Sequence, residues 1–191
     1  MRSVAFTTAA VLVAALPFTS SNAAPVSYTV DAAHTYPSFE INHLGFSTIR
    51  GRFNSTEGRI SLDTSAGTGS VEVTIDAASI DTGFAKRDDH LRSPDFLNTG
   101  EFPKITYKST KVTLAKDTGK VEGNLTINGV TKSVPLEITH FHCGQNPMNK
   151  KDACGFDAVA TIKRSDFGVT YAVPAVADEM KILLGLEASR D

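Results

Sequence analysis

The sequence has no tryptophan, only two cysteines and three methionines among its 191 residues. It also lacks an excess of either charge, with 19 basic and 21 acidic side chains and a formal net charge of −2 at pH 7. Proteins that bind nucleic acid through their surface charge have a clear excess of basic residues, and this chain has no such excess. We therefore expect no nucleic-acid partner.

The motifs of several common enzyme classes are also absent. There is no GxSxG nucleophile elbow, no HExxH zinc motif, no phosphate-binding glycine loop, no GxGxxG after a strand and no CxxCH for haem. Adjacent acidic pairs occur at 88–89 and 178–179, but neighbouring side chains on one element diverge. The sequence thus gives no catalytic residue and no metal or cofactor site, and an active site assembled from distant residues stays open.

Long apolar runs are absent except for one at the N-terminus, from Val4 to about Leu16. It follows Arg2 and precedes Ser21 and Ala23, which suit the small-residue positions of a cleavage site. The run is too short to span a bilayer, so a membrane anchor is the weaker alternative. We predict a signal peptide at 1–23 and one exported, periplasmic domain at 24–191, with 18 basic against 21 acidic side chains and hence a net charge of −3.

Two cysteines remain after export, Cys143 and Cys154, and an even number in an oxidising compartment favours a disulfide. Such a bridge would contribute roughly 3 kcal/mol in the chain-entropy model. A metal site with His140 and His142 is the alternative, but two histidines on one strand face would point away from Cys143. We predict the disulfide and no metal.

Alternating apolar and polar residues dominate the rest of the chain. In SVEVTID, for example, Val71, Val73 and Ile75 share one face, as expected for a half-buried strand. The same pattern predicts further strands at 38–44, 105–114, 121–127, 134–139, 156–162 and 180–186.

Short turns separate these strands. Asn128-Gly129 is a strong hairpin signal, because a type I′ turn needs positive φ at both central residues. The segments 117–119 and 64–69 predict two more hairpins. Strands joined so tightly are antiparallel, so the chain is predicted to be a meander of about eight strands.

One segment departs from this pattern. Phe84, Asp88 and Leu91 have helical spacing, and Asp88 and Arg92 form an i, i+4 pair, which predicts a short helix. Ser93-Pro94-Asp95 resembles a new helix N-terminus, so we expect a kink or a second helical piece there.

Eight antiparallel strands can form a closed barrel or a two-sheet sandwich, and a closed barrel leaves no unpaired edge. Its interior can be filled by side chains or can hold one small elongated ligand. The lack of tryptophan and the small inward residues Gly123, Ala158 and Ala160 favour open space. Close packing between the elements is the competing explanation for these small residues.

Four segments carry a resemblance to a known family: DAAHTYPSFEINHLGFSTIRGRF (31–53), IDAASIDTGFAKRDDHLRSPDFLNTGEFPKI (75–105), GNLTINGVTKSVPLEI (123–138) and IKRSDFGV (162–169). Together they resemble the YceI-like family of bacterial periplasmic proteins, from Tyr28 to about Leu186. The segment 140–158 resembles the branch of the family with a cysteine pair in this loop.

The resemblance implies a mainly β, lipocalin-like antiparallel barrel with a short helical excursion. It also implies a non-catalytic binding protein for a polyisoprenoid or isoprenoid quinone, with the tail in the barrel and the head at its opening. An enzyme or redox component acting on such a molecule, or an interaction protein with a filled barrel, is the alternative. A homodimer, and transient contact with a membrane or a membrane protein, stay open.

The predicted site residues form two groups. The cavity candidates are apolar: Phe39, Ile41, Val73, Ile75, Phe84, Leu91, Phe96, Leu97, Phe102, Leu125, Ile127, Phe156 and Ile162. The candidates for the rim and the head group are polar: His43, Arg50, Arg52, Asp88, His90 and Arg92. On this interpretation 88–102 is a lid, whose Leu91, Phe96, Leu97 and Phe102 turn inward.

Overall fold

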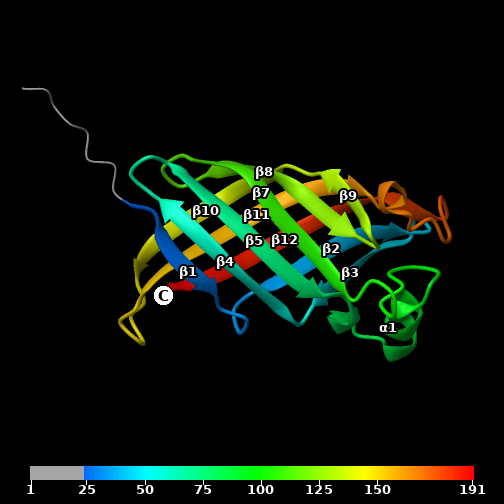
Figure 1. Cartoon of the computed structure of the whole chain (residues 1–191). Helices are drawn as coiled ribbons and strands as arrows, with labels where there is room; N and C mark the ends of the chain where they lie inside the picture. Colours follow the sequence, from blue (N-terminus) through cyan, green and yellow to red (C-terminus); the bar gives the residue numbers. More distant parts are fainter. Residues whose placement is uncertain (1–23) are drawn as a thin grey trace, which may run out of the picture.

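In the computed structural model, which describes residues 24–191, twelve strands and one α-helix build the domain (Figure 1). The predicted signal peptide lies outside the described residues. The strands are β1 (Val26–Val30), β2 (Tyr36–His43), β3 (Ser47–Phe53), β4 (Thr56–Asp63), β5 (Thr68–Asp76), β6 (Ile80–Asp81), β7 (Lys104–Leu114), β8 (Gly119–Ile127), β9 (Val130–Ser133), β10 (Leu136–Gln145), β11 (Asp152–Lys163) and β12 (Val176–Arg190). The helix is α1 (Ala85–Arg92), and short 3₁₀ turns lie at Ala77–Ser79 and Arg164–Phe167.

Eight of the strands close into an antiparallel barrel. Their order is β1-β4-β5-β7-β8-β10-β11-β12, and β12 pairs back with β1 through Tyr28↔Arg190 and Val30↔Ala188. Closure pairs the edges that an open sheet would leave free. The predicted barrel of about eight strands is confirmed, and the sandwich is wrong.

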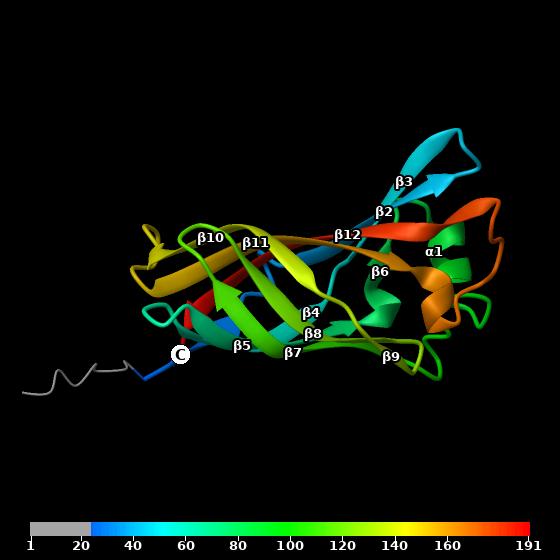
Figure 2. The same cartoon turned by 90° about the horizontal axis from the view of Figure 1, so that it is seen from above.

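Strand β12 is shared between two partners along its length. Its last residues, Ala188–Arg190, pair with β1, whereas Met180–Gly185 pair with β2. Strands β2, β3 and β6 therefore continue the wall beyond β1. Figure 2 shows the β2–β3 hairpin rising away from the barrel at the end where α1 lies.

The predicted turns are confirmed. Asn128 and Gly129 have φ of 52° and 74°, as a type I′ turn requires, and they join β8 to β9. The segments 117–119 and 64–69 lie in the β7–β8 and β4–β5 hairpins. Strands β1, β3 and β4 and the two-residue β6 were not among the predicted runs.

The predicted helix is confirmed as α1, but the second helical piece after it is wrong. Pro94 holds Ser93 in an extended conformation, with φ −71° and ψ 169°. The Ser93 hydroxyl donates to the His90 carbonyl (2.7 Å) at the end of α1, and it also accepts from the Asp95 backbone N–H (3.3 Å), as the predicted N-cap would. The residues after Pro94 form turns.

The barrel has two ends with different interiors. The end near the C-terminus, here called the filled end, is packed by side chains from facing strands: Tyr28, Val30, Leu62, Val112, Val121, Ile138, Phe141, Cys154 and Ala188. The predicted Cys143–Cys154 disulfide is confirmed there, between directly paired residues of β10 and β11. The other end, near α1, is here called the hollow end.

Candidate ligand cavity

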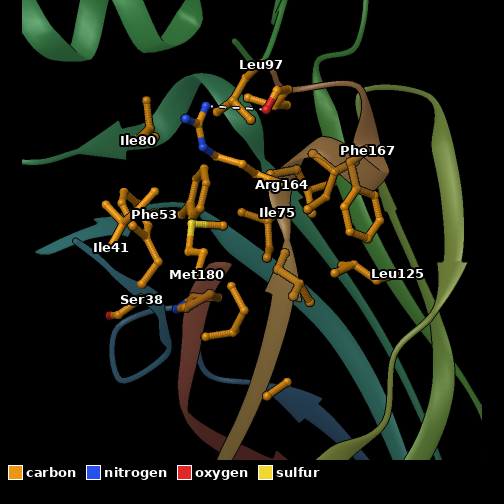
Figure 3. A pocket seen from close by; sticks show the side chains of 18 of the residues that line it. Ser38, Ile41, Phe53, Ile75, Ile80, Leu97, Leu125, Arg164, Phe167 and Met180 are labelled. Carbon is orange, nitrogen blue, oxygen red and sulfur yellow. Dashed lines mark hydrogen bonds between the residues drawn. The ribbon is translucent and has the colours of Figure 1, made fainter. Parts of the chain in front are cut away.

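The hollow end encloses a cavity of about 830 Å³. Its wall consists mostly of aliphatic and aromatic side chains from strands of both the barrel and the β2–β3 extension, and Figure 3 shows Ile41, Phe53, Ile75, Leu125 and Met180 around the space. The volume lies near the upper end of the roughly 300–1,000 Å³ that small-molecule pockets usually have. The alternative prediction, an interaction protein whose barrel is filled by its own side chains, is therefore wrong for the hollow end.

The inward faces of the strands supply the wall because alternate residues of a strand point to the same side. Pro37, Phe39, Ile41 and His43 of β2 all line the cavity. So do the two small residues of β11, Ala158 and Ala160. Eleven of the thirteen apolar candidates lie in this wall, namely Phe39, Ile41, Val73, Ile75, Leu91, Phe96, Leu97, Leu125, Ile127, Phe156 and Ile162. Contact between these side chains and a ligand stays a prediction.

Phe84 and Phe102 do not line the cavity, contrary to expectation. Phe84 precedes α1, is 55% exposed, and its ring lies 5.8 Å from the Arg87 guanidinium. Phe102 lies against the turn at Gly129, where an added Cβ would be 2.6 Å from its ring. It covers the β8–β9 hairpin instead of the cavity.

Of the polar rim candidates, His43 and His90 line the cavity, but Arg50 and Arg52 do not. Alternation along β3 turns Ile49 and Phe53 inward and the two arginines outward. Arg50 donates to Glu40 on β2 at 2.7 Å, and Arg52 lies over the Tyr36 ring.

Asp88 and Arg92 do not line the cavity either. Both side chains make hydrogen bonds to the segment that precedes α1. Asp88 is buried and accepts hydrogen bonds from the backbone N–H and the hydroxyl of Thr82. Arg92 donates to the carbonyls of Ala78 (2.7 Å) and Ile80 (2.9 Å). Their role in this structure is to tie α1 to the segment before it.

Three rings cover the cavity from the α1 side. His90 meets Phe96 and Tyr171 edge to face at centroid distances of 5.0 Å, and Phe96 and Tyr171 are 5.2 Å apart. Nε2 of His90 lies 2.9 Å from Asp95, which orients the imidazole. All three rings line the cavity, and Tyr171 was not predicted.

The model of the YceI-like domain matches residues 28–188, nearly the whole described domain. The chain belongs to the YceI-like family. Among its relatives are a UPF0312 protein of Pseudomonas paraeruginosa, 38% identical over 187 residues that cover 96% of this chain and 97% of the relative, and the protein YceI of Salmonella arizonae, 38% identical over 177 residues covering 91% and 92%.

Solved structures share the fold of this YceI-like chain. BcnA of Burkholderia cenocepacia superposes with a TM-score of 0.73 at 29% identity, covering 83% of this chain and 98% of BcnA. A polyisoprenoid-binding domain from Saccharophagus degradans, implicated in plant cell wall breakdown, has a TM-score of 0.64 at 15% identity and covers 87% and 99%. At that identity the likeness shows the fold alone.

Arg164 is a cavity residue of this YceI-like barrel that the sequence analysis did not include among the site candidates. It is 5% exposed and donates four hydrogen bonds to the carbonyls of Val169, Tyr171, Val176 and Ala177. Burial lowers the pKa of its guanidinium, although Asp178 opposes this. Two of these carbonyls lie in the loop after Arg164 and two in the first residues of β12, so Arg164 holds both ends of the segment that contains Tyr171.

Tyr107 marks the boundary between the cavity and the filled end. Its hydroxyl donates to the Val134 carbonyl at 2.9 Å, and burial, followed by the charge of Glu122, raises its pKa to about 12. An added Cβ on Gly123 would lie 2.5 Å from the Tyr107 ring. Gly123 is therefore small because this ring packs on it, whereas Ala158 and Ala160 do face open space.

The described part of the chain offers no cluster of three or more His, Cys, Asp or Glu side chains placed to hold a metal ion. Within residues 24–191, no helix has the length and hydrophobicity needed to cross a membrane.

Proposed function

We propose that this protein is a non-catalytic carrier that holds a long isoprenoid amphiphile, a polyisoprenoid or an isoprenoid quinone, for carriage, storage or sequestration. The observation that carries the proposal is the cavity of about 830 Å³ with an almost wholly apolar wall. The fold that the chain shares with a polyisoprenoid-binding domain supports the ligand class.

The binding energy would come from the tail. Each Å² of apolar surface removed from water contributes about 25 cal/mol, so a tail of several isoprene units gains enough to offset the cost of ordering it. The apolar wall contacts any such tail in a similar way, and selectivity for tail length would follow from the depth of the cavity. Because ligand binds only the folded state, the filled protein would be more stable than the empty one.

Native mass spectrometry of the exported protein, followed by solvent extraction and lipid identification, tests the proposal. We expect close to one isoprenoid per chain. If no lipid accompanies the protein and none can be loaded after delipidation, the proposal fails. A chemically altered ligand after long incubation would instead favour an enzyme.

Ala160 and Ala153 offer a matched pair of variants on β11. Ala160 lines the cavity, whereas Ala153 lies outside its wall, near the filled end. Ala160→Phe should fill part of the cavity and lower lipid retention severalfold, and Ala153→Phe should leave retention unchanged. Equal retention by both variants would show that the lipid is bound elsewhere.

We place this carrier in the periplasm, where a cleaved signal peptide would deliver it. N-terminal sequencing of protein from a periplasmic fraction should begin at residue 24. Protein found only in the cytoplasmic fraction, with residue 1 retained or only the initiator methionine removed, would contradict this location.

A further inference from the structure

Two loops lie side by side at the hollow end, and they are here called the mouth loops. Residues 42–48 form the tip of the β2–β3 hairpin, and residues 170–176 lead into β12. The backbone N–H of Leu44 in the first loop donates to the Ala175 carbonyl in the second at 3.1 Å. Figure 2 shows the hairpin tip projecting beyond the barrel, next to the orange-red segment that leads into β12. The mouth loops thus form one surface.

The mouth loops expose large apolar side chains and carry no charge. Phe46 is 88% exposed, and Leu44 and Tyr171 are each 48% exposed. Neither loop contains Asp, Glu, Lys or Arg. Leu44 has a φ of 55°, a conformation that Gly, Asn or Asp adopts more easily, so an apolar residue stands where a polar one would be favoured. Exposed apolar patches of this kind are typical of sites that contact a protein partner or a membrane.

This surface is continuous with the cavity. Leu44, Tyr171 and Ala175 are exposed to solvent, and all three also line the cavity. Phe46 follows Leu44 by two residues and lies outside the cavity wall. The mouth loops therefore border an opening through which a long apolar ligand can pass.

The backbone of the hairpin tip is already hydrogen-bonded within the chain. The N–H group of Gly45 donates to Oδ1 of Asn42 at 2.9 Å. The N–H group of Phe46 donates to the His43 carbonyl at 3.0 Å, and that of Leu44 donates to the second mouth loop. A backbone N–H group without a partner is costly in lipid. The tip can therefore leave water without bringing these three donors unpaired into an apolar phase.

Building on the carrier function proposed above, on which this inference rests, we propose that the mouth loops dock on a lipid bilayer. Phe46 and Leu44 insert among the lipids, and the ligand passes between membrane and cavity without crossing water. A projecting tip can enter a lipid surface, but it offers little of the roughly 800 Å² that each partner buries in a standard protein interface. Tyr171 suits the boundary between water and lipid because its side chain is amphipathic.

The basic side chains of the hairpin are paired with carboxylates. Arg50 lies 2.7 Å from Glu40, and Arg52 lies 3.9 Å from Asp81. Anionic membranes attract clusters of basic residues, whereas this hairpin offers apolar surface instead. We therefore expect the protein to bind neutral phosphatidylcholine vesicles at least as tightly as vesicles that contain anionic lipid. Binding that requires anionic lipid would contradict insertion of the mouth loops.

A pair of equally exposed side chains at opposite ends of the barrel tests the proposal. Met148 is 90% exposed on the β10–β11 loop at the filled end. In flotation with phosphatidylcholine vesicles, Phe46→Ser should lower the partition coefficient about 10-fold, as the loss of one inserted aromatic side chain predicts. Met148→Ser should keep the wild-type value. Equal partitioning of wild type and Phe46→Ser, or equal losses in both variants, would overturn the proposal.

Tryptophan fluorescence locates the contact directly. The chain has no tryptophan, so Phe46→Trp introduces a single reporter. With vesicles its emission should shift to shorter wavelength, and lipids brominated on their acyl chains should quench it. Met148→Trp should show neither change. A Phe46→Trp reporter that stays in water while the protein is bound to vesicles would contradict docking through the mouth loops.

Lipid retention in solution separates this proposal from the carrier function. Phe46→Ser should retain as much lipid as wild type by native mass spectrometry, but transfer of geranylgeraniol from vesicles to the delipidated variant should be severalfold slower. Retained lipid without vesicle binding would overturn docking and leave the carrier standing. Vesicle binding by a protein that can hold no lipid would instead remove the carrier function.

Sedimentation velocity tests the other occupant of this surface, a second copy of the chain. We expect the same sedimentation coefficient for wild type and Phe46→Ser. A wild-type dimer that Phe46→Ser dissociates would assign the mouth loops to a subunit interface and overturn the proposal.

Discussion

The filled end and the hollow end of this barrel are built from the same strands, yet their interiors differ. On β8, Val121 packs into the filled end, whereas Leu125 and Ile127 line the cavity. On β11, Cys154 lies in the filled end, and Ala158 faces the cavity. The inward face of a strand is set by its alternation, but whether the space in front of that face is filled depends on the strands opposite.

The wall itself differs between the two ends. At the filled end β1 bridges β4 and β12, and a disulfide ties β10 to β11. At the hollow end β2 and β3 take the place of β1 beside β12 and lead away from the barrel. The chain covers this end with α1 and with the loop that contains Tyr171, whose carbonyl accepts from Arg164.

The largest expected difference comes from two leucines. Leu62 is 2% exposed in the filled end, whereas Leu184 borders the cavity. Leu62→Ala should cost roughly 3–5 kcal/mol of unfolding free energy because it opens a new void in a packed core. Leu184→Ala in delipidated protein should cost less than about 2 kcal/mol, because it only enlarges an existing space. Denaturant titration measures both, and equal losses would mean that the hollow end is packed as tightly as the filled one.

The next effect comes from the disulfide of the filled end. Reduction, or the double change Cys143→Ser and Cys154→Ser, should lower the unfolding free energy by about 3 kcal/mol, as expected for a loop of this length. Lipid retention at neutral pH and low temperature should stay as in wild type, because neither cysteine lines the cavity. Loss of retention in a variant that is still folded would show that the two ends are coupled.

Tyr107 allows a test at the boundary between the ends. Its pKa, raised to about 12, exceeds the ordinary value of 10.0, so the folded state holds this proton more tightly than the unfolded chain. The resulting stabilisation is fully present below pH 10 and is lost as pH rises through 12, a change of about 2–3 kcal/mol.

The matched variant for this test is Tyr107→Phe. It should be less stable than wild type at pH 8 by about 1 kcal/mol, because the Val134 carbonyl loses the hydroxyl group that donates to it. It should also show a shallower fall in unfolding free energy from pH 10 to 12. Parallel curves for the two proteins would mean that Tyr107 ionises without cost in the folded state.

The smallest effect is expected at Phe46, on the tip of the β2–β3 hairpin. This side chain is 88% exposed and is absent from the cavity wall. Phe46→Ser should change the unfolding free energy by less than about 0.5 kcal/mol and should leave lipid retention in solution unchanged. A large loss of stability would mean that the hairpin packs against another part of the chain.

The sequence predicted those parts of the fold whose signal is local. Alternation gave the strand that contains Val73 and Ile75, and Asn128-Gly129 gave a hairpin with its turn type. Alternation along β3 could also have excluded Arg50 from the cavity rim, because Ile49 and Phe53 point to the opposite face of the strand from Arg50.

The parts that could not be predicted depend on residues far apart in the chain. Gly123 shows that an inward glycine can leave no space at all when a ring from the neighbouring strand, here that of Tyr107, covers it. The partners of Arg164 are backbone carbonyls, which carry no residue-type signal.

The pairing of β12 with β1 has a consequence for biosynthesis. Every other strand of the barrel precedes β12 in the chain, so the ring cannot be completed on the ribosome before this last strand has emerged. Until then the strands keep unpaired edges and expose their apolar faces, a state prone to aggregation. For the carrier function proposed above, this means that a ligand can enter a closed cavity only after β12 has paired with β1.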